Sequence, residues 1–236
     1  YRIKNTIGYS MNSFVDYSDP LDIFSHLLVG AEGTLAFISA VMLNTVSDFE
    51  HQATGLIIYN SASNACNTIL DFKDSGAAAI EFLDDKSLRT AVNIQNPPYN
   101  PKNIQSNSAG MLIEYQCDSE SELKRRIKTA ENILQKSRAL DISSSFSSDI
   151  SKRENLWKIR KGLYPTVGAL RNLGTTVITE DIAVDVEDFA DIVEDMKVVF
   201  ETCGFNDAVT FGHAKDGNLH FVCSVDLETS EGVKNY

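Results

Sequence analysis

Hydrophobic and polar positions along the chain alternate between strand-like and helix-like spacing, and this alternation predicts a mixed fold. Short apolar runs rich in Val, Ile, Phe and Tyr, bounded by Gly, Asn, Ser or Asp, are typical of strands. Longer segments with apolar residues three or four positions apart are typical of helices that pack on a sheet. From about residue 50 onward, strands and helices of both kinds follow one another, and the series closes with a hairpin.

The order of the predicted elements indicates one fold class. Strand–helix–strand occurs twice between residues 53 and 147, which matches the ferredoxin-like βαββαβ arrangement. Ser119 with Glu122, and Ser151 with Glu154, form capping boxes that predict where two long helices begin. The predicted strands cover residues 53–60, 77–85, 109–118, 139–147 and 175–184, and the predicted helices cover 61–76, 86–94, 119–137 and 186–204 together with one from 151. The sequence therefore predicts an α+β fold, a ferredoxin-like domain with additional strands and helices.

The first 48 residues differ in character from the rest, so the predicted boundary separates residues 1–48 from residues 49–236. Asp19 is a suitable N-cap and Pro20 a suitable first residue for a short helix. The stretch "VGAEGT" then interrupts the helix, and residues 35–46 predict a strand. Its Gly-x-x-Gly spacing would let the backbone approach a ligand closely, although an ordinary structural turn is the favoured explanation.

The stretch "FGHAKDGNLH" holds two histidines around an Asp-Gly pair, inside an otherwise apolar region. Asp-Gly between apolar runs predicts a two-residue type I′ hairpin turn. Counting outward from Asp216 and Gly217 places His213 opposite His220, with Cβ atoms roughly 4.5–5.5 Å apart. Two imidazoles that close could share one divalent metal, zinc above all, or they could simply stack on a half-buried sheet face.

Composition narrows the classes of function. The chain has 236 residues and a net charge of −12, which argues against binding to nucleic acid or to an anionic membrane. No apolar run reaches the ~20 residues that cross a bilayer. Four scattered cysteines without a CxxC pair indicate neither a disulfide scaffold nor an iron–sulfur site, and they fit a reducing cytoplasm. The sequence begins at Tyr1 and ends at "EGVKNY" without residues typical of a domain boundary at either end. We therefore expect a piece of a longer protein.

Four stretches resemble the FAD-linked oxidases of the vanillyl-alcohol oxidase type. "KNTIGYSMNSF" and "GAEGTLAFISAVML" are similar to segments near the end of that family's flavin-binding domain. "LWKIRKGL" and "GHAKDGNLH" resemble the LWxxR helix and the GHxGDGNxH motif of its C-terminal domain. Within the family the resemblance is to D-2-hydroxyacid dehydrogenases of D-lactate or D-2-hydroxyglutarate. "RKGLYPTVGALR" with "GTTVITEDIAV" is most similar to large bacterial members fused to iron–sulfur modules.

The resemblance implies a role for particular residues. It implies that His213 and His220 are metal ligands, with a third ligand, a glutamate, and a histidine base beyond Tyr236, so that no catalytic residue lies within the chain. Arg160 would clamp a substrate carboxylate and Asn218 would contact the substrate. Helical spacing puts Trp157, Arg160 and Tyr164 on one face; a solvated helix face is the alternative for Arg160. The residues expected against the flavin are Gly30, Glu32, Gly33 and Phe37.

Some positions depart from the family pattern. Lys215 replaces a glycine at the hairpin turn, and Ala31 and Ala36 replace serine and glycine. Thr179 stands where the hydroxyglutarate enzymes carry a lysine, so a second substrate carboxylate would need another partner. Arg171 and Lys161 are the candidates for that partner.

The resemblance implies an FAD-dependent D-2-hydroxyacid dehydrogenase in which a hydride passes from substrate C2 to the flavin. Its partners would be a small D-2-hydroxyacid, the remaining flavin domain and an electron acceptor. By itself the chain is expected to be inactive and free of flavin. A metal-dependent hydrolase would need a third ligand and a base within the chain, and no HExxH or similar set occurs. A non-catalytic, metal-binding assembly domain is the other alternative.

Overall fold

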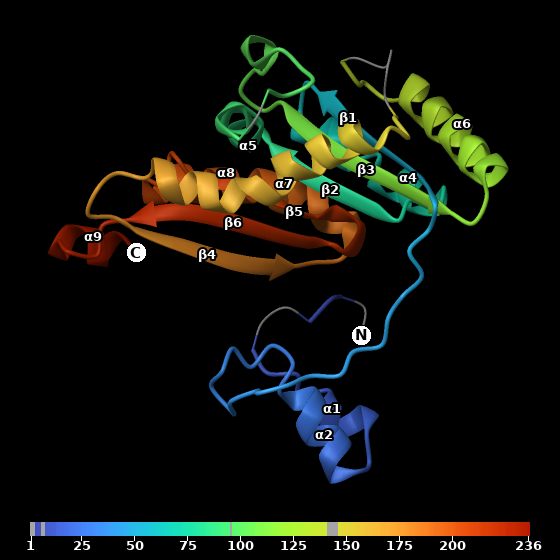
Figure 1. Cartoon of the computed structure of the whole chain (residues 1–236). Helices are drawn as coiled ribbons and strands as arrows, with labels where there is room; N and C mark the ends of the chain where they lie inside the picture. Colours follow the sequence, from blue (N-terminus) through green and yellow to red (C-terminus); the bar gives the residue numbers. More distant parts are fainter. Residues whose placement is uncertain (1–2, 6–7, 95, 141–145) are drawn as a thin grey trace.

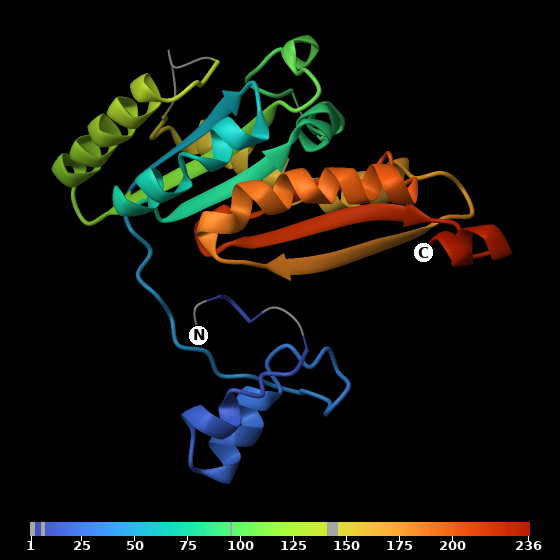
Figure 2. The ribbon, with the colours of Figure 1, turned by 180° about the vertical axis from the view of Figure 1, so that it is seen from behind.

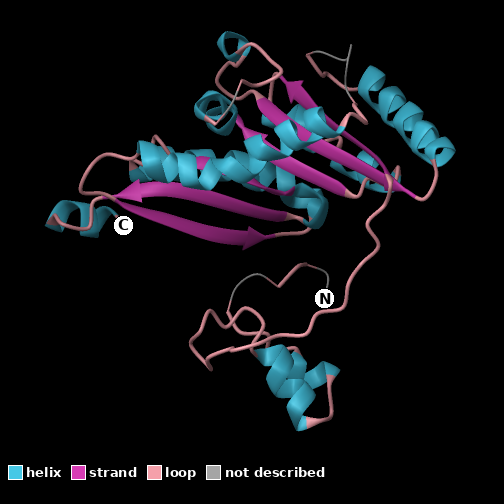
Figure 3. Cartoon of the chain, in the orientation of Figure 1, coloured by secondary structure: helices cyan, strands magenta, loops and turns pink. Residues whose placement is uncertain are grey.

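The computed structural model describes residues 3–5, 8–94, 96–140 and 146–236, and its centre is an antiparallel sheet (Figures 1 and 3). Within these residues six strands follow the order β1-β3-β2-β5-β6-β4, and every neighbouring pair is antiparallel. The strands are β1 His51–Tyr59, β2 Ala79–Asp84, β3 Ala109–Cys117, β4 Thr176–Ala183, β5 Val209–His213 and β6 Asn218–Val225.

Helices cover both faces of this sheet (Figure 2). One apolar cluster joins the sheet to α3, α4, α6 and α8, and a second joins the opposite face to α5 and α7. The helices are α1 Ser13–Asp16, α2 Pro20–Leu27, α3 Ala62–Cys66, α4 Ile69–Asp74, α5 Asp85–Thr90, α6 Glu120–Lys136, α7 Ile150–Leu170, α8 Phe189–Cys203 and α9 Ser230–Asn235. Short 3₁₀ turns are η1 Ala91–Asn93, η2 Pro101–Asn103, η3 Val186–Asp188 and η4 Ala214–Asp216.

The predicted fold class is confirmed. The order β1-β3-β2, with helices between successive strands, is the core of a ferredoxin-like sheet, and β5, β6 and β4 extend it from the edge of β2. The predicted strand 139–147 falls partly on residues 141–145, which lie outside the described residues. On either side of them, Ala139 and Ser147 form antiparallel bridges to the free edge of β1, where a fourth ferredoxin-like strand belongs.

The predicted N-cap residue is confirmed for α6 and is wrong for α7. Ser119 caps α6 by accepting a hydrogen bond from the Glu122 N–H at 3.3 Å. The Ser151 cap is wrong, because Asp149 caps α7 by accepting from the Lys152 N–H at 2.9 Å. The predicted helix 61–76 is two helices, since the helical conformation is interrupted between α3 and α4.

The segment before the sheet contains two short helices and little buried surface. Asp19 caps α2 through the N–H groups of Leu21 and Asp22, as predicted. The predicted strand at 35–46 is wrong: this stretch pairs with no described strand. Its apolar side chains stay exposed, with Phe37 at 92%. A strand needs a neighbour for its backbone groups, and the described residues provide none.

Candidate functional site

A row of polar side chains crosses the whole sheet on the face that α7 covers. Directly opposed residues of antiparallel strands point to the same face, and the register pairs Thr54 with Glu114, Glu81 with His213, and Asp181 with His220. Each strand thus contributes one member to the row. In sheet order these are Thr54, Glu114, Glu81, His213, His220 and Asp181.

The hairpin that carries the histidines has a different register from the predicted one. His220 lies opposite Phe211. The prediction that His220 lies directly opposite His213 is therefore wrong, by a shift of two residues. The turn is the 3₁₀ turn η4 followed by Gly217, which alone takes the left-handed conformation there (φ 68°). A shift of two residues keeps a side chain on its face. The two imidazoles therefore still meet, with ring centroids 5.0 Å apart and planes 88° to each other.

Two glycines of the motif are required by close backbone contacts. A Cβ at Gly212 would lie 2.3 Å from the carbonyl oxygen of Asn218. A Cβ at Gly217 would lie 2.0 Å from the carbonyl oxygen of Val184. The hairpin is thus pressed against its own second strand and against the end of β4, which fixes where both histidines emerge.

Glu81 connects His213 to α7. Its Oε1 accepts a hydrogen bond from Nδ1 of His213 at 2.7 Å, and its Oε2 accepts from Nε of Arg160 at 2.8 Å. The Arg160 guanidinium also lies 4.6 Å from the centre of the Phe211 ring, and its side chain is only 12% exposed. Arg160 is therefore not on a solvated helix face. Tyr164, expected on the same inward face, is 49% exposed, so that part of the prediction is wrong.

His220 has its own carboxylate partner. Its Nδ1 bonds to Oδ1 of Asp181 on the neighbouring strand. Burial lowers the pKa of His220 below its ordinary value, and the hydrogen bond with Asp181 opposes this effect without reversing it. The ring is therefore neutral at a pH of about 7.

The two pairs leave the same ring atom available on each histidine. A carboxylate can only accept, so the neutral form of each imidazole would carry its proton on Nδ1 and an electron pair on Nε2. Neither Nε2 has a hydrogen-bond partner among the described residues. The described part of the chain groups no three His, Cys, Asp or Glu side chains so as to hold a metal ion. It thus offers two nitrogen donors, and further ligands would come from elsewhere.

Asn218 lies at the start of β6 with its side chain buried. Its Nδ2 donates to the carbonyl oxygen of Ile182 at 3.1 Å. In this position the side chain ties the hairpin to β4.

The glycine-rich residues of the N-terminal segment lie beside β4. A cavity of about 410 Å³ is bounded on one side by the loop around Gly30 and Glu32 and on the other by Thr179 and Asp181. Gly30, Glu32 and Gly33 all have positive φ angles, and a Cβ at Gly33 would meet no atom within 4 Å. The loop is therefore open to a molecule that approaches its backbone. Asp181 lines this cavity and also forms the hydrogen bond with His220.

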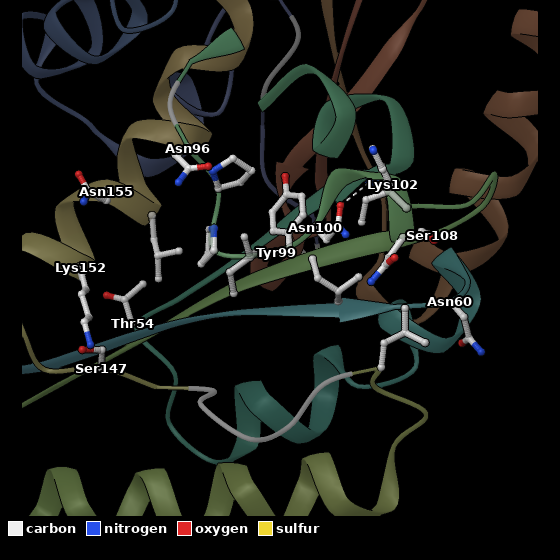
Figure 4. A pocket seen from close by; sticks show the side chains of 18 of the residues that line it. Thr54, Asn60, Asn96, Tyr99, Asn100, Lys102, Ser108, Ser147, Lys152 and Asn155 are labelled. Atoms are coloured by element: carbon white, nitrogen blue, oxygen red, sulfur yellow. Dashed lines mark hydrogen bonds between the residues drawn. The ribbon is translucent and has the colours of Figure 1, made fainter. Parts of the chain in front are cut away.

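A larger cavity of about 1100 Å³ lies on the α7 face over β1 (Figure 4). Its lining combines apolar side chains of β1 with the amide-rich loop before β3, including Asn96 and Asn100. The charged residues of its lining are two lysines, Lys102 and Lys152. It lies beyond Glu114, away from the histidines.

Sequence reasoning missed the carboxylates of this site. Glu81 and Glu114 each interrupt an apolar run, "AAAIEFL" and "AGMLIEY". A charged residue inside a fully buried strand is costly unless it is paired, and that signal could have singled out both.

Comparison with known proteins identifies the family. Residues 49–236 match the FAD linked oxidases, C-terminal domain. The chain belongs to this family. Solved structures share the fold: an alkyldihydroxyacetonephosphate synthase aligns with a TM-score of 0.58 at 14% identity, covering 90% of this chain and 42% of the synthase.

Curated relatives match most of this chain at low sequence identity. Glycolate oxidase subunit GlcD of Bacillus subtilis (strain 168) is 25% identical and covers 89% of this chain and 43% of its own length. D-lactate dehydrogenase of Anaerostipes hadrus is 25% identical over 89% of this chain and 44% of its own length. A probable mitochondrial D-2-hydroxyglutarate dehydrogenase of Oryza sativa subsp. indica is 26% identical over 83% and 34%. The chain thus spans less than half the length of these relatives.

Proposed function

We propose that this chain is part of an FAD-dependent dehydrogenase that oxidises a D-2-hydroxyacid, D-lactate or D-2-hydroxyglutarate, to the 2-oxoacid. The observation that carries the proposal is the pair of imidazoles 5.0 Å apart, next to Arg160, within a domain of the FAD-linked oxidases. Relatives named D-lactate dehydrogenase and D-2-hydroxyglutarate dehydrogenase support the substrate class. The flavin would accept the hydride from substrate C2.

His213 and His220 would hold a divalent metal, with zinc as the first candidate. The donor set fits such an ion, because both Nδ1 atoms are held by carboxylates and both Nε2 atoms are available. A divalent ion there would polarise the hydroxyl and carboxylate oxygens of the substrate.

Arg160 would bind the substrate carboxylate. Glu81 engages its Nε, and its two terminal nitrogens make no hydrogen bond to any described residue. A guanidinium fixed at one edge still presents the fork that a carboxylate fits. Asn218 would contact the substrate after its amide is released from the carbonyl oxygen of Ile182.

Gly30, Glu32, Gly33 and Phe37 would lie against the flavin. The open backbone at Gly33 and the exposure of Phe37 support a partner surface there. Residues 1–48 would then complete a flavin-binding domain and residues 49–236 would form the substrate domain. The remaining flavin domain is thus the expected covering for the exposed apolar stretch at 35–46.

The parent protein is expected to carry further modules and to reside in a reducing compartment. The similarity of the α7–β4 region to fused bacterial members supports iron–sulfur modules outside this chain, which would lead to the electron acceptor. The four free cysteines support a reducing compartment such as the cytoplasm. No helix among the described residues is long and apolar enough to cross a membrane. Thr179 in place of a lysine favours D-lactate over a diacid.

Steady-state oxidation with a dye acceptor tests the proposal. The intact protein is expected to reduce the dye with the D enantiomer of lactate or 2-hydroxyglutarate, and much more slowly with the L enantiomer. If neither acid leads to dye reduction in a protein that holds its flavin, the proposed function is contradicted. Binding of cobalt without any oxidation would instead favour the non-catalytic assembly domain.

A further inference from the structure

Glu81 is one carboxylate that serves two functional side chains on different elements. Its two oxygens are divided between them: Oε1 takes Nδ1 of His213 across the strand pair, and Oε2 takes Nε of Arg160 from α7. The carboxylate is 5% exposed, so solvent does not compete for either oxygen. The position of α7 over β2 is therefore coupled to the orientation of the His213 ring.

The shared carboxylate also determines which nitrogen of His213 can act. Arginine has only donors, and an ionised carboxylate has only acceptors. With Oε2 occupied by Arg160, the remaining oxygen can bind His213 only through an N–H at Nδ1. This bond selects the tautomer with a free electron pair on Nε2, the atom that a ligand on the open side would meet.

Glu114 shows what the same residue does with other neighbours. It lies on the adjacent strand, on the same face, and is also 5% exposed. Its Oε2 accepts from Trp157 Nε1 at 2.6 Å and from Thr54 Oγ1 at 2.7 Å. Its Oε1 accepts from Gln116 Nε2 at 2.7 Å. All three partners are neutral, and none of them is a histidine or an arginine. The chain thus contains a matched buried glutamate outside the histidine pair.

We propose that Glu81 is the positioning residue of the site, which holds His213 in the Nδ1–H tautomer and fixes Arg160 beside it. Asp181 does the same for His220 from the other side, but no second partner of this kind lies among the described residues. The consequence for metal and substrate rests on the proposed function. The tautomer itself depends on neither metal nor substrate.

Nitrogen-15 NMR of the histidine rings tests the tautomer in the intact protein. The His213 signals can be assigned from one His213→Ala variant, because they are the ones missing from its spectrum. At a pH well above the ordinary imidazole pKa of about 6.5, His213 is expected as the Nδ1–H tautomer. A predominantly Nε2–H ring would overturn the proposal, whatever reaction the protein catalyses.

Glu81→Gln, with Glu114→Gln as the matched control, tests the positioning role. Arg160 can only donate, so it should keep the glutamine carbonyl oxygen, and the amide N–H would then face Nδ1 of His213. The ring should change to the Nε2–H tautomer. Cobalt, used as the spectroscopic probe metal, should bind ~10–100-fold more weakly. Glu114→Gln should leave the tautomer and the cobalt affinity unchanged.

The outcomes separate this proposal from the proposed function. A change of tautomer in Glu81→Gln alone supports the positioning role even where the wild-type protein binds no cobalt and oxidises no hydroxyacid. Equal effects of the two variants on the tautomer would overturn it. Should Glu81→Gln fail to fold, the wild-type tautomer still decides, because it needs no variant at Glu81.

Discussion

Two halves of one sheet face use the same buried residue for different purposes. In the histidine half, made of Glu81, Arg160, His213, His220 and Asp181, every carboxylate meets a cation or a titratable ring. In the tryptophan half, made of Thr54, Glu114, Gln116 and Trp157, the carboxylate meets neutral donors. Burial costs the same kind of desolvation in both. The partners decide whether a buried glutamate supports chemistry or only structure.

The largest effect should follow from removing a ring of the histidine half. His213→Ala removes one of two nitrogen donors, and kcat/KM for the D-2-hydroxyacid should fall at least ~1000-fold, about 4 kcal/mol. His51→Ala, at the start of β1 and outside the site, is the control and should keep its activity. Wild-type kinetics in the His213→Ala protein would show that the histidine half takes no part in the reaction.

Asp84, at the end of β2, is a buried carboxylate with neither a cation nor a ring. It accepts from the backbone N–H groups of Ser87 and Thr210. Burial raises its pKa from 3.8 to about 6. A raised pKa means that the folded state binds the proton more tightly, so stability falls as pH rises from about 4 to about 6, by up to about 3 kcal/mol.

The difference in unfolding free energy between wild type and Asp84→Asn, measured across this pH range, isolates the contribution of Asp84. Wild type should lose stability relative to the variant as pH rises. A difference that stays constant with pH would show that Asp84 keeps its ordinary pKa.

In the tryptophan half, a substitution should change stability and leave kinetics alone. Trp157→Phe removes the N–H group that donates a hydrogen bond to Glu114. The free energy of unfolding should therefore drop by about 1.5–3 kcal/mol. kcat/KM should stay within ~3-fold of wild type. Unfolding is best followed by circular dichroism, because this is the only tryptophan in the chain. A large kinetic defect with unchanged stability would reverse the assignment of the two halves.

The smallest predicted effect comes from Arg160→Lys. Lysine keeps the charge that Glu81 needs but lacks the planar fork, so kcat/KM should fall at least ~10-fold, about 1.4 kcal/mol. Arg153→Lys, two turns earlier on α7, is the matched control. Arg153 bonds to Gln52, outside the histidine half. Equal kinetics in both variants would leave Arg160 as a partner of Glu81 only.

Local patterns in the sequence were sufficient for much of the fold. Alternation within the apolar runs located the strands, and Ser119 located the start of α6. The histidines were found because Asp-Gly marks a turn, and they share a face even though the turn is longer than predicted. A two-residue error in register preserves the face of a strand, which explains why the two histidine rings still meet.

What the sequence could not show depends on pairs that are far apart along the chain. Nothing near Arg160 in sequence indicates Glu81, which is 79 residues earlier and reaches it only through the sheet. The exposed stretch at 35–46 was predicted as a strand because its composition suits one, but pairing is a property of the neighbour as well. Partners supplied by other strands, or by other parts of a protein, leave no local pattern.

The central claim is that hydride passes from C2 of a D-2-hydroxyacid to a flavin held beside this domain. The most direct test is to mix the intact flavoprotein anaerobically with D-lactate or D-2-hydroxyglutarate, unlabelled and deuterated at C2, and to follow the flavin absorbance. We expect one of these acids to bleach the flavin, and to do so more slowly when C2 carries deuterium. A flavin that stays oxidised with every D-2-hydroxyacid, or that bleaches at the same rate with both isotopes, would contradict it.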